Sequence, residues 1–111
     1  MRTERDQRGA TRVELRLPAR LTTETGERIE AELRNVSLSG AFFACPAGAR
    51  VRSRLCVELR IDPAADPLGA EMEVVRVTDE GLGCRFLGLE GRTASRLRAF
   101  LSRQVRRGLT G

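Results

Sequence analysis

The stretch Val13-Glu-Leu-Arg-Leu-Pro-Ala-Arg-Leu21 indicates the fold class of this chain. Apolar residues alternate along it with charged residues or proline, which is the period of a strand that buries one face and exposes the other. Because Pro18 has no amide hydrogen to donate, we expect it at a sheet edge or at a bulge. The stretch therefore predicts a half-buried strand.

The same alternation recurs along the chain and predicts five further strands. Residues 29–34 follow a turn that contains Gly26, so the first two strands should form an antiparallel hairpin. The alternation changes phase within residues 70–77, which predicts a bulge there. Short turns connect the segments without crossover helices, and this favours antiparallel pairing. The remaining expected strands are residues 41–45, 51–61 and 83–87.

The last segment has a different period. Apolar side chains from Ala94 to Val105 recur at helical spacing, with Thr93 as a candidate N-cap and Gly108 as a stop signal. We therefore expect an all-β fold with one helix: a six-stranded antiparallel β-barrel whose mouth is capped by a C-terminal α-helix at about residues 93–107.

The chain of 111 residues has the length of one domain. Residues 1–12 are charged and have no apolar period, so we expect a flexible arm that bears arginines. Residues 13–111 should form the single barrel domain with its helix. This division leaves room for the arm to move against the barrel.

Composition narrows the class of function. The net charge is +5 and every one of the 20 basic residues is arginine, which favours anionic partners. The absence of histidine, of a glycine-rich phosphate loop and of a cysteine paired with a base argues against an enzyme, and we expect no metal site and no cofactor. Three cysteines without a C-x-x-C pair fit a reducing compartment. We expect a cytoplasmic protein without membrane insertion.

Two motifs carry the functional argument. Arg8-x-x-x-Arg12 is weak alone, because several arginine pairs have this spacing. Asn35-x-Ser37-x-x-Gly40 is sharper, because chance predicts only about 0.02 matches to [D/N]-x-S-x-x-G in a chain of this composition. Arginine can donate two parallel hydrogen bonds to a phosphate or to a guanine edge. A glycine, which has no side chain, allows a ligand to approach the backbone closely. Together they suggest a site for a ligand with guanine and phosphate groups.

These motifs, in this order, resemble the PilZ domain, a bacterial receptor module for cyclic di-GMP. The resemblance extends over the first strand, Gly48–Val51, Gly81–Phe86 and the helix, although Asp is the commoner residue at position 35. It implies that Arg8 and Arg12 clamp the ligand, that Asn35 and Ser37 bond a guanine, and that Gly40 keeps the loop backbone close. Arg5 and Arg76 are additional candidates for the same site.

Other interpretations remain open at this stage. A basic barrel with an arginine arm also suits nucleic acid, although Trp and Tyr are absent and base stacking is poorly served. A PilZ-type adaptor that binds only protein is a further alternative. We expect cyclic di-GMP as ligand, a downstream protein effector as partner, and a monomer or weak dimer. Of Phe42 and Phe43, one must point outward if the run is extended.

Overall fold

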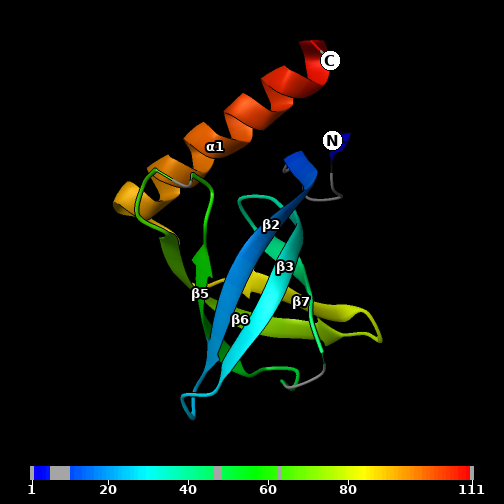
Figure 1. Ribbon diagram of the computed structural model, residues 1–111, viewed down its shortest axis with the longest axis vertical. Coiled ribbons are helices and arrows are strands. Elements are labelled where there is room, and N and C mark those ends of the chain that lie inside the picture. The colour runs from blue at the N-terminus through cyan, green and yellow to red at the C-terminus, as the bar shows by residue number, and fades with distance from the viewer. Residues whose placement is uncertain (1, 6–10, 47–48, 63, 111) are drawn as a thin grey trace.

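The computed structural model describes the backbone of residues 2–5, 11–46, 49–62 and 64–110, and side chains within the range 12–106 (Figure 1). Within these ranges the chain consists of strands followed by one helix. The elements are β1 Arg2–Arg5, β2 Thr11–Thr23, β3 Arg28–Val36, β4 Gly40–Ala44, β5 Arg54–Leu59, β6 Leu68–Val77, β7 Gly81–Phe86 and α1 Gly91–Thr110.

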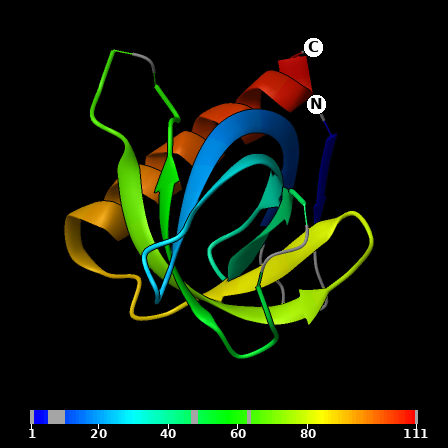
Figure 2. The same cartoon turned by 60° about the horizontal axis from the view of Figure 1, so that its bottom comes forward.

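The strands from β2 to β7 close into a barrel. Their order is β2-β3-β4-β7-β6-β5, every pair is antiparallel, and a further pairing of β2 with β5 closes the ring. Figure 2 shows this ring with α1 behind it, so the helix covers one end. The predicted six-stranded antiparallel barrel with a C-terminal helix is confirmed.

Strand β2 is long and irregular, and it pairs with β3 on one side and with β5 on the other. Its pairing with β3 shifts register between Glu14 and Leu17, whereas its pairing with β5 begins only at Ala19. Pro18 pairs with Glu32 of β3 and precedes the β5 ladder. At Pro18, β2 therefore pairs with β3 on one side only, and its other side is an unpaired strand edge. A strand edge tolerates proline, which has no amide hydrogen to donate.

One apolar core fills the barrel. The inward positions alternate along each strand, for example in β5, where every second residue is buried. The predicted bulge in β6 is present as a register shift between Val74 and Arg76, and it leaves Val75 exposed on the surface. The largest fully buried side chains are Phe43, Leu21, Leu33, Leu55, Leu59, Leu68, Met72, Leu82, Leu97, Val13, Val36 and Val57.

Helix α1 packs on the barrel through one face that includes Leu97, Phe100 and Leu101. It is longer than the predicted range of residues 93–107. The amide of Ala94 already bonds the Glu90 carbonyl, so Thr93 lies inside the first turn and is not the N-cap. Gly108 also lies inside the helix, since one glycine near a helix end is tolerated.

No helix within the described residues is both long and apolar enough to cross a bilayer.

The beginning of α1 is held by a hydrogen bond in addition to its apolar packing on the barrel. The Arg96 guanidinium donates to the backbone carbonyl of Asp66 over 2.6 Å. This bond fixes the beginning of the helix to the loop that precedes β6.

The N-terminal residues differ from the expected flexible arm. Arg2–Arg5 form strand β1, which pairs antiparallel with the beginning of β2 in the register Arg5↔Thr11. Apolar periodicity did not reveal this strand, because an edge strand is held by backbone hydrogen bonds that charged residues also make. Residues 6–10 lie outside the described part of the chain, and the division between arm and barrel stays a prediction.

Candidate ligand-binding face

A continuous row of residues crosses the outer face of the barrel. Glu14 of β2 pairs with Asn35 of β3, Asn35 pairs with Phe42 of β4, and Phe42 pairs with Gly83 of β7. Gly83 in turn pairs with Arg76 of β6. We call these five residues the outer row. Register thus brings together side chains that are far apart in the sequence.

The direction of the row follows from the alternation of each strand. Val13, Val36 and Phe43 are fully buried in the core, so their neighbours Glu14, Asn35 and Phe42 point the other way. This resolves the alternative left open for the two phenylalanines. Phe43 is core, and Phe42 is half-buried on the outer face.

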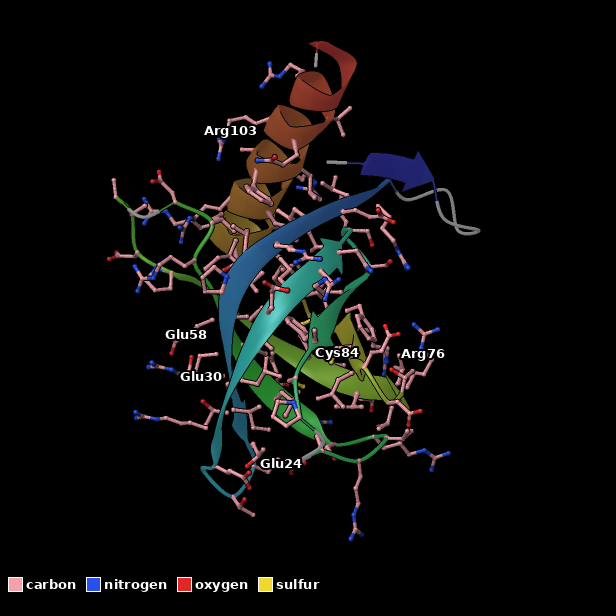
Figure 3. The ribbon with its side chains drawn as sticks, turned by 45° about the vertical axis from the view of Figure 1, so that its right-hand side comes forward. Glu24, Glu30, Glu58, Arg76, Cys84 and Arg103 are labelled. Atoms are coloured by element: carbon pink, nitrogen blue, oxygen red, sulfur yellow. The ribbon has the colours of Figure 1, made fainter. Side chains whose placement is uncertain are left out.

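Arg76 and Phe42 meet across the space that Gly83 leaves. The guanidinium carbon of Arg76 lies over the Phe42 ring, 5.9 Å from its centroid, within the range of a cation–π contact. A methyl group added at Gly83 would lie 3.4 Å from Cβ and 3.5 Å from Nε of Arg76. The arginine therefore lies along the bare glycine backbone, and Figure 3 shows Arg76 at the barrel side away from Arg103 of α1.

An open hollow lies beside this pair. Its volume is about 450 Å³, and it is lined by Asn35, Phe42, Arg76, Thr78, Asp79 and Glu80. A larger hollow of about 1010 Å³ shares Asn35, Phe42 and Glu80 with it and extends to Phe100 and Gln104 of α1. The predicted residues Asn35 and Arg76 thus line one concave surface, together with an aromatic ring and two carboxylates.

The Ser37–Gly40 loop is bonded to itself. Ser37 is fully buried, and its hydroxyl lies 2.9 Å from the Ser39 hydroxyl. The same oxygen accepts from the amides of Ser39 and Gly40, while the Ser37 amide donates to the Gly40 carbonyl over 2.8 Å. In this structure Ser37 shapes the loop, and the expected bond from Ser37 to a guanine stays a prediction.

Gly40 has a steric role on the inner side of the loop. A Cβ atom at this position would lie 2.3 Å from the carbonyl oxygen of Cys84 in β7, a distance that real Cβ atoms do not show. Gly40 therefore permits the close approach of β4 to β7. A close approach to a ligand, which the sequence suggested, stays a prediction.

The arginine motif is described at only one of its two positions. Arg12 lies in β2 two residues before Glu14, so it shares the outward direction of the outer row, and it pairs with Glu4 of β1. Arg8 lies outside the described residues, and for Arg5 only the strand position opposite Thr11 is described. The joint clamp by Arg8 and Arg12 stays a prediction.

Two buried polar atoms among the described residues lack a hydrogen-bond partner: Nε of Arg12 and Oε1 of Gln104. Buried polar groups are nearly always bonded, so each exception calls for an explanation. Gln104 lines the larger hollow, and Arg12 is the second residue of β2, directly after the N-terminal segment. A ligand that reaches either atom would restore a bond that the protein does not supply.

Cys84 of β7 and Cys45, which follows β4, are protonated thiols. Burial raises the pKa of Cys84 to about 12, and the neighbouring Cys45 adds to the rise. Burial also raises the pKa of Cys45 above 9.0. Neither thiol is a nucleophile at neutral pH, because the reactive form is the thiolate.

Phe42, Gly83 and the turn Thr78–Glu80 are members of this face that the motifs did not reveal. The alternation of Ala41, Phe42 and Phe43 signals that one ring points outward. No sequence signal places Gly83 between Phe42 and Arg76, because the pairing register of non-adjacent strands is set by the folded barrel.

Comparison with known proteins identifies relatives at the levels of family and fold. The model of the PilZ domain family matches residues 6–103. The PilZ domain with c-di-GMP of YcgR from Escherichia coli superposes with a TM-score of 0.77 at 14% identity, covering 93% of this chain and 95% of that one. No match was found among curated proteins.

Two longer solved structures share the fold. The Bacillus subtilis inhibitor of motility MotI/DgrA has a TM-score of 0.74 and 16% identity over 95% of this chain. YcgR in complex with c-di-GMP from Escherichia coli has a TM-score of 0.71 and 17% identity over 95% of this chain. The chain spans about half of each, 52% and 50%. The family match covers most of the sequence, and the chain belongs to the PilZ domain family.

Proposed function

We propose that this chain is a cyclic di-GMP receptor and that it binds the dinucleotide on the face formed by Arg12, Asn35 and the hollow beside Arg76. The observation that carries the proposal is the shared direction of these residues. Asn35 belongs to the sharper motif and lines the hollow, and Arg12 belongs to the arginine motif and shares the outward direction of Glu14, which pairs with Asn35. The PilZ family match supports the ligand class.

The chemistry of the face suits both parts of the ligand. An arginine can bond guanine O6 and N7 with two parallel donors, or a phosphate with the same fork. The Asn35 amide offers a donor and an acceptor to a base edge. Arg12 has a buried Nε without a protein partner, so it is suited to receive a phosphate oxygen. In this proposal Ser37 and Gly40 act indirectly by holding Asn35 in place.

Charge orients the ligand on the face. The hollow contains the carboxylates of Asp79 and Glu80, which repel a phosphate and accept from the N–H groups of a guanine. Arg12 stands on β2, at the β1 end of the face. We therefore place a guanine in the hollow and a phosphate at Arg12, with Arg8 as the second member of the clamp.

Signal output follows from the place of Arg12 beside β1. A ligand that engages the Arg12 side chain contacts β2 where it carries β1, because Arg12 lies opposite Glu4 in the β1–β2 ladder. Binding shifts the population of arm positions, and a protein effector reads the new surface.

The direct test is calorimetric titration with cyclic di-GMP beside an oligonucleotide, each at two salt concentrations. We expect saturable cyclic di-GMP binding and a raised melting temperature at ~100 µM ligand, since a ligand of the folded state stabilises it by RT ln(1 + [L]/Kd). The absence of both heat and thermal shift contradicts the proposal. Oligonucleotide binding that weakens steeply with salt, without a cyclic di-GMP response, favours the nucleic-acid alternative.

A matched pair of variants tests the placement of the site. Asn35→Ala should weaken cyclic di-GMP binding by ~1–3 kcal/mol, the scale of one good base contact. Leu38→Ala changes an exposed residue of the neighbouring loop and should bind like wild type. Equal losses in both variants would show that the loop matters only as a scaffold.

A further inference from the structure

We propose that the exposed face of α1 binds the phosphate backbone of double-stranded nucleic acid through Arg92, Arg98 and Arg103. The helix covers one end of the barrel (Figure 2), and this face shares no residue with the outer row. The site adds a second binding function to the one proposed above, and it does not depend on cyclic di-GMP.

The net positive charge of the chain is confined to α1. The whole chain has 20 arginines and 15 acidic residues, with no lysine and no histidine. Helix α1 contains six of these arginines and no acidic residue, which leaves 14 arginines and 15 acidic residues for all other positions. Apart from the helix, the chain is therefore close to neutral. Such a charge asymmetry is typical of proteins that bind a polyanion.

Three arginines of the helix are available to an anion. They have exposed side chains and form no ion pair with another residue that the structure describes: Arg92, Arg98 and Arg103. Arg96 differs from them, because its guanidinium donates to the Asp66 carbonyl and holds the helix on the barrel. On the barrel strands, Arg20 and Arg85 each lie beside a glutamate carboxylate, at 3.0 and 2.7 Å.

The available arginines flank a strip of small side chains. At about 100° per residue, Arg92 and Arg103 lie roughly 120–140° around the helix axis from Arg98. The exposed residues between these two flanks are Ser95, Ala99 and Ser102. A helix is roughly 10–12 Å wide with its side chains, and the major groove of B-DNA is roughly 12 Å wide. The small strip lets α1 enter the groove while the arginines reach the phosphates along both edges.

The chemistry of the face favours a phosphate backbone over other anionic surfaces. A helix that lies on a membrane inserts its apolar face into the lipid. The apolar face of α1, with Leu97, Phe100 and Leu101, is buried on the barrel instead. A protein interface is centred on large apolar or aromatic side chains, and on the described part of α1 no large hydrophobic side chain is exposed. A phosphate backbone needs neither feature, because charge and counterion release supply the binding.

The test is fluorescence anisotropy of a labelled mixed-sequence DNA duplex of about 20 base pairs, titrated with the full chain at about 50 and about 200 mM salt. We expect saturable binding that is about 40-fold weaker at the higher salt, the change for three neutralised phosphates. The triple variant Arg92→Gln, Arg98→Gln and Arg103→Gln should lose about 10-fold or more in affinity at low salt and should show a smaller salt dependence. Lysine at the same three positions keeps the charge and should leave the affinity within about threefold of wild type.

A second triple variant is the matched control. It also removes three exposed positive charges, by the substitutions Arg28→Gln, Arg50→Gln and Arg52→Gln. These positions lie at the β2–β3 turn and in the loop before β5, which are joined by a hydrogen bond from the Arg54 amide to the Glu24 carboxylate. Figure 3 shows Glu24 and Arg103 at opposite ends of the molecule. The control should bind the duplex like wild type.

The outcomes decide between the helix face and its alternatives. Equal losses in the two glutamine variants overturn the proposal, because they would reflect the total charge of the chain. Absence of duplex binding by wild type, or binding that the helix variant does not weaken, also overturns it. Poly-glutamate that competes as well as unlabelled duplex would assign the face to an acidic protein partner instead.

Two further measurements keep the result independent of folding and of the ligand face. Thermal melting should be the same in all variants, because the substituted side chains are exposed. Cyclic di-GMP binding should be unchanged in the helix variant. A chain that binds the duplex but not cyclic di-GMP would overturn the receptor function alone, and the reverse result would overturn the helix site alone.

Discussion

The Ser37–Gly40 loop and the outer row lie side by side on the barrel, yet they are built in opposite ways. In the loop, the Ser37 hydroxyl is fully buried and satisfied by its neighbours, and the Gly40 backbone is pressed against β7. In the outer row, Phe42 and Arg76 border an open hollow. The polar atoms of the loop bond one another, whereas Asn35, Phe42 and Arg76 of the row line an open hollow.

The comparison distinguishes residues that the fold of the loop requires from residues that form a surface for a ligand. Ser37 is required because its hydroxyl bonds the loop, and Gly40 because a Cβ atom there would collide with the carbonyl oxygen of Cys84. Asn35, Phe42 and Arg76 depend on cross-strand pairing that places them on one surface. Changes in the loop should therefore act mainly on stability, whereas changes in the row should act mainly on binding.

Gly40→Ala should have the largest effect on stability. The new methyl group would lie 2.3 Å from a backbone oxygen of β7, so the strand pair must separate. We expect a loss of about 3 kcal/mol or more in the free energy of unfolding, at the upper end for overpacked sites. Urea denaturation measures it, with Gly83→Ala as control, whose methyl group makes ordinary contacts and should cost less than about 1 kcal/mol.

Similar losses in the two glycine variants would remove the distinction between a closed loop and an open row. A stable Gly40→Ala protein with normal melting would show that β4 and β7 can move apart without cost.

Ser37→Ala should cost about 1–3 kcal/mol of stability, because it leaves the Ser39 and Gly40 amides and the Ser39 hydroxyl without their common partner. Ser102→Ala on the exposed side of α1 is the control and should melt like wild type. Thermal and urea unfolding measure the difference. If Ser37→Ala keeps full stability but loses ligand binding, the hydroxyl belongs to the recognition surface and our division is wrong.

Arg12→Lys should weaken cyclic di-GMP binding by ~1–3 kcal/mol and change unfolding by less than about 0.5 kcal/mol. The charge is kept, but the fork that matches a phosphate or guanine edge is lost. The Nε atom of Arg12 makes no hydrogen bond within the protein, so its removal costs the fold little. Unchanged affinity would mean that Arg12 contributes only charge, and a strongly lowered melting temperature would make it a structural residue.

Burial of Cys84, whose carbonyl lies against Gly40, should give a small pH dependence of stability. The pKa of the Cys84 thiol is raised from 9.0 to about 12 by burial and by Cys45. Because the folded pKa lies above the unfolded value, the stabilisation is complete below pH 9 and is lost as pH rises toward 12. Unfolding free energy should fall by about 1 kcal/mol between pH 8 and pH 10.

The chain suits this measurement because it contains no tyrosine and no lysine that would titrate in the same range. Urea unfolding of wild type and Cys84→Ala at both pH values gives the result. A pH dependence that is identical in the two proteins would show that the Cys84 thiol is open to solvent.

The sequence was sufficient for the barrel and for part of the site. Alternation from Val13 onward predicts the strands, and the phase shift near Val75 predicts the bulge, because both reflect burial of side chains. Strand β1 was missed because backbone pairing leaves no apolar pattern. The motif located Asn35, but it could not show that Ser37 is buried or that Gly83 separates Phe42 from Arg76. Those facts depend on strand register, which the closed barrel sets.

The most direct test of the account is backbone amide NMR of the wild-type chain during a cyclic di-GMP titration. We expect the largest shifts at Asn35, Phe42, Arg76 and the turn Thr78–Glu80, with small changes at the opposite hairpin around Gly26. Shifts confined to the Ser37–Gly40 loop, or centred on α1, would contradict the outer row as the recognition surface.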